Sequence, residues 1–273
     1  MFKKARFNRI CKRIKEIKIQ GATNVAKSAL KAYYLFPSKS TKAKLLKLRP
    51  TEPMLSHVLQ LAEKQPKSKI LSHFPEAQIK INKQVYRLIK NSDVIFTHCH
   101  STNVVKALMY SKKKSKKFEV YNTETRPLYQ GRRTAKELKH AGIKVTQFID
   151  SAAGIALSNE QGTKKPDKVF LGADALLKDS VINKVGSETI AKLAYINKIP
   201  VYIIADSWKY AHNQKIPLEN RELNEVWDRA PKNIKIKNPA FESIDKKYIK
   251  AIISDISTKP QPYNQFLKKV KNK

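Results

Sequence analysis

Residues 93–108 read DVIFTHCHSTNVVKAL, which places a strand directly before a helix. The run from Val94 to Phe96 is short and apolar, which is typical of a buried strand. Ser101 follows as a helix-capping residue, and the apolar positions after it recur at helical spacing. At this junction Cys99 would meet unpaired backbone N–H groups and the helix dipole, which favour a thiolate and attract anions. The segment therefore predicts the ligand-facing edge of an α/β domain.

Short apolar runs alternate with helical segments from Asn91 onward. This alternation indicates right-handed βαβ units and a mainly parallel sheet, so the expected fold class is α/β. We expect the chain after Ala230 to be less regular and to end at the sheet edge, with a helix over residues 246–253. The expected strands lie at residues 94–96, 118–122, 144–149, 168–171 and 201–205.

Helical periodicity alone marks the first 90 residues. One helix and then another are expected between Phe7 and Phe36, separated at residues 20–22, and further helices over 40–48, 52–63 and 75–90. We therefore expect a helical N-terminal domain of residues 1–90 and a second domain of residues 91–273.

Composition limits the class of protein. The 273 residues are 41% hydrophobic, which suits a globular chain with a core of ordinary size. The two cysteines, Cys11 and Cys99, lie far apart, which argues against a disulfide framework. No run of about 18 apolar residues occurs, so we expect a cytoplasmic protein without a membrane span. Neither a dinucleotide-binding glycine fingerprint nor a P-loop is present.

The formal net charge of +34 results from 56 Lys and Arg against 22 Asp and Glu. One interpretation is binding to nucleic acid, and the other is a coding bias that fills solvated faces with lysine. The lysines are spread over nearly every segment, and the dense clusters at 112–117 and 268–273 are most simply solvated ends. Either way, the field would steer small polyanions toward the protein.

Polar side chains follow the expected strands, where open parallel sheets bind ligands. Cys99, Arg126, Asp174 and Lys209 each follow such a strand, and Asn183 and Lys184 precede a later helix. Each has an ordinary alternative: a buried small apolar residue for Cys99, a surface ion pair for Arg126, and turn or cap residues for the others. A zinc site formed by His98, Cys99 and His100 is not expected, because on an extended strand the two histidines would point to one face and the cysteine to the other.

Several segments together resemble one family, the alpha, beta and delta regulatory subunits of eukaryotic initiation factor 2B, a superfamily that also holds two sugar-phosphate isomerases. They are IQGA (19–22), RPT (49–51), THCHS (97–101), TETRP (123–127) with QG (130–131), DSA (150–152), GAD (172–174), NKVG (183–186) and NPAF (238–241). The resemblance spans nearly the whole chain and is greatest to archaeal ribose 1,5-bisphosphate isomerase and archaeal initiation factor 2B subunit-like proteins. It implies a helical N-terminal domain followed by a Rossmann-like catalytic domain.

The resemblance also implies site residues. Cys99 and Asp174 match the catalytic pair of the isomerases, which regulatory subunits commonly lack. The implied reaction converts ribose 1,5-bisphosphate to ribulose 1,5-bisphosphate by proton transfer, without metal or organic cofactor. The implied substrate-binding residues are Gln20, Gly21, Ala22, Thr23, Arg49, Ser101, Thr102, Arg126, Asn183, Lys184 and Lys209.

One departure from the isomerase pattern leaves alternatives open. Gln20 replaces an arginine that usually precedes the Gly-Ala turn, so the identity of the sugar phosphate stays open and methylthioribose 1-phosphate is an alternative substrate. A second alternative is a non-catalytic regulatory subunit that binds initiation factor 2 or RNA. The family also implies a homo-oligomer, a dimer or a hexamer.

Overall fold

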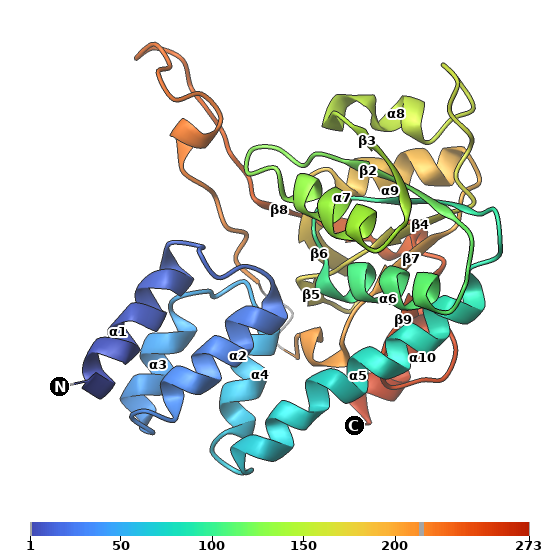
Figure 1. Ribbon diagram of the computed structural model, residues 1–273. Helices are drawn as coiled ribbons and strands as arrows, with labels where there is room; N and C mark the ends of the chain where they lie inside the picture. The colour runs from blue at the N-terminus through green and yellow to red at the C-terminus, as the bar shows by residue number, and fades with distance from the viewer. Residues whose placement is uncertain (1, 213–215, 273) are drawn as a thin grey trace.

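Four helices form the N-terminal part of the computed structural model, which describes residues 2–212 and 216–272 (Figure 1). They are α1 (Phe2–Lys15), α2 (Ala22–Tyr33), α3 (Lys39–Leu46) and α4 (Pro53–Leu61). Their apolar faces meet in one core in which Ile14, Leu30 and Leu59 are fully buried. The expected break at residues 20–22 is present, because Gly21 has a φ of 82° and precedes the first turn of α2.

The long helix α5 (Lys67–Leu88) connects the helical core with the sheet (Figure 1). Ile70 and Phe74 belong to the helical core, whereas Ile81 and Val85 pack in a core that covers the sheet. The sequence places the start of this helix at Pro75, but the helix begins eight residues earlier. Burial of Ile70 and Phe74 favours the helical conformation before the proline, despite the N–H that Pro75 lacks.

Six strands form the main sheet, in the order β3-β2-β1-β4-β7-β9, and every pairing in it is parallel. The order reverses between β1 and β4, which is where doubly wound sheets bind ligands. The α/β fold class and the five expected strands are confirmed. Their bounds are β1 (Val94–Thr97), β2 (Glu119–Thr123), β3 (Lys144–Phe148), β4 (Lys168–Leu171), β7 (Val201–Ile204) and β9 (Ala251–Ile253).

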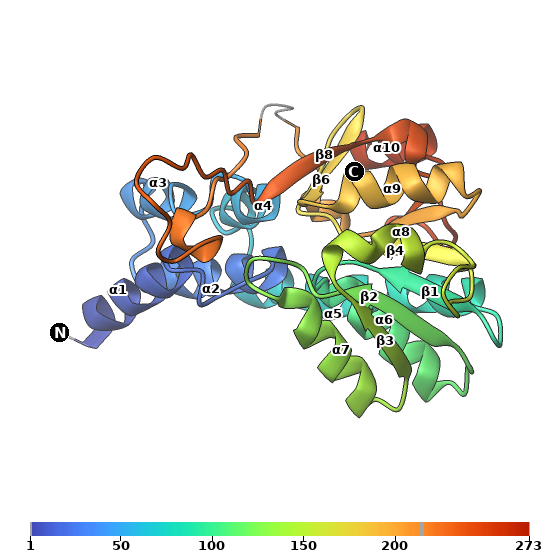
Figure 2. The same ribbon diagram turned by 90° about the horizontal axis from the view of Figure 1, so that it is seen from above.

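Helices cover both faces of this sheet (Figure 2). On one face, α5, α6 (Thr102–Lys113) and α7 (Gln130–His140) pack on residues such as Ile95 and Phe170. On the other face, α8 (Ala153–Ala156), α9 (Ser187–Ile196) and α10 (Tyr263–Lys271) pack on residues such as Phe96 and Leu171. Successive strand residues thus enter different cores, so both faces are apolar.

The C-terminal region differs from the expectation. The helix expected over residues 246–253 is wrong: a short 3-10 turn (Lys246–Tyr248) leads into the edge strand β9, because Ala251, Ile252 and Ile253 are buried beside β7. A second, antiparallel sheet of β5 (Ala175–Leu176), β6 (Ser180–Lys184) and β8 (Phe241–Asp245) was not expected. Lys268, Lys269 and Lys271 of the C-terminal cluster lie on the exposed side of α10, whose Phe266 is buried, and Lys273 lies outside the described residues.

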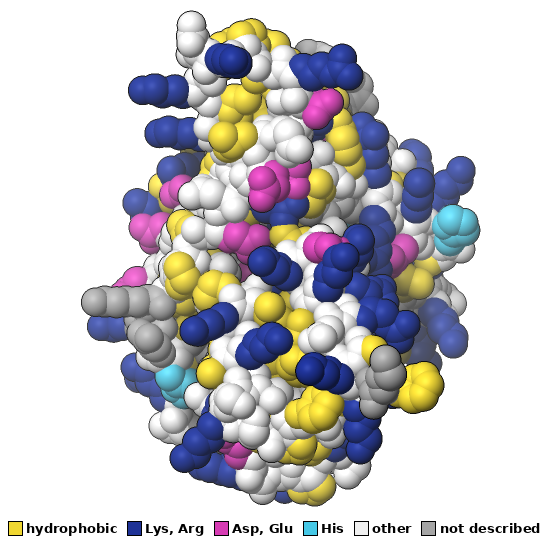
Figure 3. All heavy atoms as spheres, turned by 90° about the vertical axis from the view of Figure 1, so that its left-hand side faces the viewer, with side chains coloured by type: hydrophobic (Ala, Val, Ile, Leu, Met, Phe, Trp, Pro, Cys, Tyr) yellow, Lys and Arg dark blue, Asp and Glu magenta, His cyan; other side chains and the backbone are white. Residues whose placement is uncertain are grey.

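An arm of residues 216–238 leaves the second sheet, and its outer part projects from the molecule (Figure 1). Several of its large apolar side chains are exposed, among them Leu223 and Trp227, each about half accessible. Lys and Arg side chains are spread over the whole face shown in Figure 3 rather than gathered in one patch. No helix in residues 2–212 and 216–272 is long and apolar enough to cross a bilayer.

Candidate active site

A cavity of about 110 Å³, partly open to solvent, lies at the carboxyl ends of β1 and β4. Its wall is built from both parts of the chain, because the turns before α2 and α4 face the loops after β1 and β4. The arm and the second sheet complete it. The residues that line it are Ile17, Gln20, Gly21, Ala22, Thr23, Arg49, Glu52, His98, Cys99, His100, Ser101, Thr102, Asn103, Leu128, Gln130, Ala173, Asp174, Asn183, Lys184, Lys209, Glu219, Arg221, Ala240 and Phe241.

Cys99 lies in the turn between β1 and α6, with a φ of 64°. Its N–H donates to the Thr125 hydroxyl (3.0 Å), and its carbonyl accepts from the Thr134 hydroxyl (2.8 Å). Burial raises the pKa of the thiol to about 12, although Lys184 acts in the other direction. Burial therefore opposes the thiolate that the position before α6 was expected to favour.

His98, the residue before Cys99, holds this turn in place through two hydrogen bonds. Its Nε2–H donates to the Val185 carbonyl (2.9 Å), which leaves Nδ1 to accept from the Thr123 hydroxyl (2.5 Å). Burial lowers the pKa of His98 to about 4, so the ring is neutral at pH 7. The extended geometry expected for residues 98–100 is wrong, because β1 ends at Thr97 and the backbone turns at Cys99.

Asp174 follows β4, the neighbour of β1 at the point where the strand order reverses. Burial raises the pKa of this carboxyl, whereas the positive charges of Lys209, Arg49 and Lys184 lower it. The Lys209 ammonium is buried and donates to the Ala173 carbonyl (2.5 Å). The cavity wall thus combines a thiol, a carboxyl group of raised pKa and a nearby ammonium group, which are the elements of proton transfer.

The N-termini of two helices meet at this cavity. Gly21 precedes α2 and Thr102 begins α6, and a side chain at Gly21 would lie 3.9 Å from the Thr102 hydroxyl. The first turns of α2 and α6 carry no acidic residue. Gly172 permits the approach of α6, because a Cβ atom there would lie 2.6 Å from the Ser101 side chain. Two converging helix N-termini form a site that favours a phosphate group.

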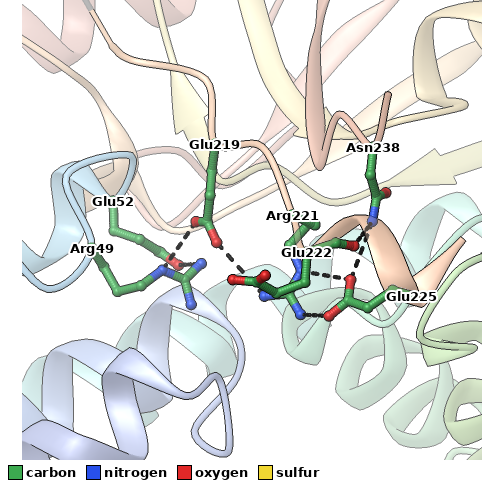
Figure 4. A network of polar contacts seen from close by, with 7 residues as sticks. All are labelled: Arg49, Glu52, Glu219, Arg221, Glu222, Glu225 and Asn238. Atoms are coloured by element: carbon green, nitrogen blue, oxygen red, sulfur yellow. Dashed lines mark hydrogen bonds and ion pairs between the residues drawn. The ribbon is translucent and has the colours of Figure 1, made fainter. Parts of the chain in front are cut away.

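A network of ion pairs borders the cavity on the side of the arm (Figure 4). Arg49 lies near the carboxylates of Glu52 (3.3 Å) and Glu219 (3.4 Å). Arg221 contacts Glu219 (3.8 Å) and pairs with Glu225. The two arginines are therefore surrounded by acidic groups, unlike Lys184, which makes no ion pair with a described residue.

Comparison with known proteins identifies the family. Residues 11–259 match the model of the initiation factor 2 subunit family. The chain belongs to this family. It is 32% identical to a ribose 1,5-bisphosphate isomerase of Methanocaldococcus jannaschii, over 91% of this chain and 89% of that protein. It is 30% identical to a methylthioribose-1-phosphate isomerase of Fervidobacterium nodosum, over 94% of this chain and 87% of that protein.

The fold is shared with solved structures of the family. The crystal structure of the Pyrococcus horikoshii OT3 translation initiation factor eIF-2B superimposes with a TM-score of 0.81, at 25% identity, over 94% of this chain and 97% of that chain. The family resemblance of the sequence motifs is thereby confirmed. The two-domain boundary at residue 90 stays a prediction.

All but one of the predicted catalytic and substrate-binding residues line the cavity. Arg126 is the exception: its guanidinium donates to the Tyr129 hydroxyl (2.5 Å) and the Val226 carbonyl (3.2 Å), away from the described lining. Asp150 explains this placement, because its carboxylate accepts from the Thr125 and Arg126 N–H groups and fixes the turn. The local sequence around Arg126 could not reveal this orientation.

Several lining residues were missed by sequence reasoning. Glu52 directly follows the Arg-Pro-Thr segment, so the motif itself could have drawn attention to it. Glu219 and Arg221 lie on the irregular arm, where periodicity gives no signal. His98 and His100 were considered only as metal ligands, whereas His98 supports the turn and His100 contacts the Thr134 hydroxyl (3.1 Å).

One group of side chains outside the cavity has the composition of a metal site. His73, Asp206 and Asp255 offer ligand atoms that lie within 4.8 Å of one another. These atoms already have partners: His73 Nε2 contacts Asp206 (3.0 Å), and Asp255 accepts from the Ser207 N–H (2.7 Å). The group fixes the turn that carries Lys209, and hydrogen bonding accounts for its geometry.

Proposed function

We propose that this chain is a sugar-phosphate isomerase that interconverts an aldose 1-phosphate and the corresponding 2-ketose 1-phosphate. The observation that carries the proposal is the placement of Cys99 and Asp174 on one cavity wall beside the N-termini of α2 and α6. Relatives over about nine tenths of the chain are named as isomerases of ribose 1,5-bisphosphate and methylthioribose 1-phosphate. Ribose 1,5-bisphosphate, converted to ribulose 1,5-bisphosphate, is the first substrate to test.

The proposed mechanism transfers two protons to the substrate and removes two. Asp174, as the carboxylic acid, donates a proton to the ring oxygen while the bond from C1 to that oxygen breaks. Cys99, as the thiolate, removes the proton from C2 and an enol forms between C1 and C2. Cys99 then returns its proton to C1, and Asp174 takes the proton of the C2 hydroxyl. Both residues end as they began, and the product is a ketone at C2.

Because the pKa of the Cys99 thiol is raised, a nearby positive charge is needed to stabilise its thiolate. Burial raises the pKa of Cys99 to about 12, so the thiol must first release its proton to solvent before the thiolate acts at C2. The Lys184 ammonium favours the thiolate, and Lys184 in turn has a pKa lowered mainly by burial. We propose that Lys184 stabilises the thiolate during the proton transfer at C2.

The first test is a direct isomerase assay. We expect the purified protein to convert ribose 1,5-bisphosphate to ribulose 1,5-bisphosphate, and we expect Cys99→Ser and Asp174→Asn each to lower kcat at least about a hundredfold, the lower range for loss of an acid or base group. Product formation is followed by chromatography.

Two matched variants serve as controls for this assay. Cys11→Ala removes the other cysteine, which is buried in the helical core, and Asp179→Asn changes an exposed aspartate that pairs with Lys246. Both should keep the wild-type kcat. Full activity of Cys99→Ser, or no turnover of any pentose 1-phosphate by the wild-type protein, would refute the proposal.

The second candidate function is regulation of translation initiation without catalysis. It is favoured by the solved structures of similar fold that are titled translation initiation factor eIF-2B. A pull-down of initiation factor 2 or of RNA that persists at moderate salt, together with an inactive wild-type protein, would support it. The homo-oligomer implied by the family is checked by light scattering on the same sample.

A further inference from the structure

The ion-pair network beside the cavity contains more acidic than basic groups (Figure 4). Arg49 is only 6% exposed and lies between Glu52 and Glu219, while Arg221 lies between Glu219 and Glu225. Two guanidinium groups thus face three carboxyl groups. Because both guanidinium groups are already paired with carboxyl groups, a phosphate dianion placed here would have to displace a carboxylate to reach Arg49 or Arg221.

Glu52 is the member of this network that lies deepest. It is 3% exposed, one of its oxygens contacts Arg49, and the other, Oε2, is buried without a hydrogen-bond partner among the described residues. The charged groups that face it are Arg49, Lys209, Asp174 and Glu219. Burial and the charge of Asp174 raise its pKa to about 7, so the carboxyl group is near its titration point at neutral pH.

Arg49 offers the complementary groups. Its Nη1 atom is also buried and has no hydrogen-bond partner within the described part of the chain, whereas its Nε atom lies 3.4 Å from Glu219. An unpaired acceptor on Glu52, Oε2, therefore lies in the same network as an unpaired donor on Arg49, Nη1. A hydroxyl group donates and accepts at once and would satisfy both, whereas an ionised phosphate only accepts.

We propose that Glu52 is a specificity-determining residue: it withholds Arg49 from a phosphate group and binds a sugar hydroxyl group in its place. Gln20, on the same cavity wall, adds no positive charge that would offset the carboxylates. The proposal rests on the proposed isomerase function and adds that the number of phosphate groups decides which sugar is the better substrate.

The phosphate then has one favourable position, at the meeting of the N-termini of α2 and α6 on the cavity wall that also carries Lys184. The favoured substrate is a pentose with a single phosphate group and free hydroxyl groups, rather than a bisphosphate. The pentose monophosphate is therefore expected to be a better substrate than the bisphosphate. The proton transfers at Cys99 and Asp174 are the same for both.

The test compares two sugars that differ only in the second phosphate, ribose 1-phosphate and ribose 1,5-bisphosphate. We expect the wild-type protein to have the higher kcat/KM with ribose 1-phosphate. Glu52→Gln keeps the shape of the side chain and removes its charge, so it should raise the ratio of kcat/KM for the bisphosphate over the monophosphate about tenfold, through a lower KM for the bisphosphate. An unchanged or lower ratio overturns the proposal.

Controls separate this proposal from the isomerase function and from misfolding. Glu63→Gln changes a surface glutamate that pairs with Lys42 and should leave the ratio unchanged. If Glu52→Gln does not fold, Glu219→Gln removes the other carboxylate of Arg49 and should raise the ratio in the same direction. If the wild-type protein converts neither sugar, the isomerase function fails, and calorimetric binding of the two sugars to wild type and Glu52→Gln still decides the role of Glu52.

Discussion

His98 shows how one residue outside the reaction can define the pH range of the protein. Both ring nitrogens are used, by Val185 and Thr123, and burial holds the pKa of the ring at about 4, against an ordinary value of 6.5. His100, enclosed in the same turn, has a pKa lowered to about 4 for the same reason. A proton on Nδ1 of His98 would remove the acceptor that the Thr123 hydroxyl uses.

These two rings predict acid destabilisation within a defined window. Between pH 6.5 and 4 the unfolded chain binds more protons at these histidines than the folded one, so the free energy of unfolding falls as the pH is lowered through that range. His98→Gln removes one titrating group and should reduce the slope by up to one proton, about 1.4 kcal/mol per pH unit. Urea unfolding at several pH values measures it, and an unchanged slope would contradict the assignment.

The residues of the site differ in how far the sequence could predict them. The strand pattern predicts that Cys99 and Asp174 lie at one edge of the sheet, because the ends of adjacent parallel strands meet there. Their role as a catalytic pair was implied only by the family resemblance. The protonation of Cys99 could not be predicted, because desolvation depends on what encloses the thiol. Glu52 and Arg221 come together only because the arm returns to the helical part, and no local pattern encodes such a contact.

Among the elements, α7 packs so closely against the end of β2 that a side chain at Gly131 would clash with the backbone. Gly131, in the first turn of α7, donates its N–H to the Glu124 carbonyl (3.1 Å) and accepts from the Asn122 side chain (2.9 Å). A Cβ atom at Gly131 would lie 1.8 Å from the Thr123 carbonyl oxygen. The helix can therefore approach the strand only because this residue is glycine.

Gly131→Ala should consequently destabilise the protein by about 3 kcal/mol, the upper range for overpacking, because backbone atoms must move. Thermal or urea unfolding measures the loss. Gly154→Ala on α8 is the matched control, since a Cβ atom there meets nothing within 4 Å and alanine favours the helix. Equal stability of the two variants would contradict the packing described for α7.

The accuracy of the element predictions followed the strength of the local signal. Strands such as β4 (Lys168–Leu171) are buried along their full length, and the strand expected there is confirmed. The second sheet was missed because β5 has only two residues and β8 follows the irregular arm. For residues 246–253, the spacing of the apolar residues suggests a helix. Instead, Asp245 caps a 3-10 turn by accepting from the Lys247 N–H, and the apolar residues that follow pair with β7.

At the scale of the whole molecule, the cavity depends on contact between the helical part and the sheet. Trp208, next to Lys209, stacks on His73 of α5 with ring centroids 3.5 Å apart, and His73 also binds Asp206. Lys209 is thus positioned by a contact between the two parts, and the wall that holds Gln20 and Arg49 comes wholly from the helical part. The site exists only in the assembled chain.

The net charge of +34 is a property of the whole molecule and predicts a strong salt effect on the proposed reaction. Because the basic side chains are spread over the surface, their combined field, rather than one patch, should attract a phosphorylated sugar to the cavity. Raising NaCl from about 0.02 M to about 0.5 M shortens the screening length several-fold, so kcat/KM should fall steeply while kcat at saturating substrate stays nearly constant. Steady-state assays across this range measure both quantities. A kcat/KM that does not change with salt would mean that the positive charge has no part in substrate capture.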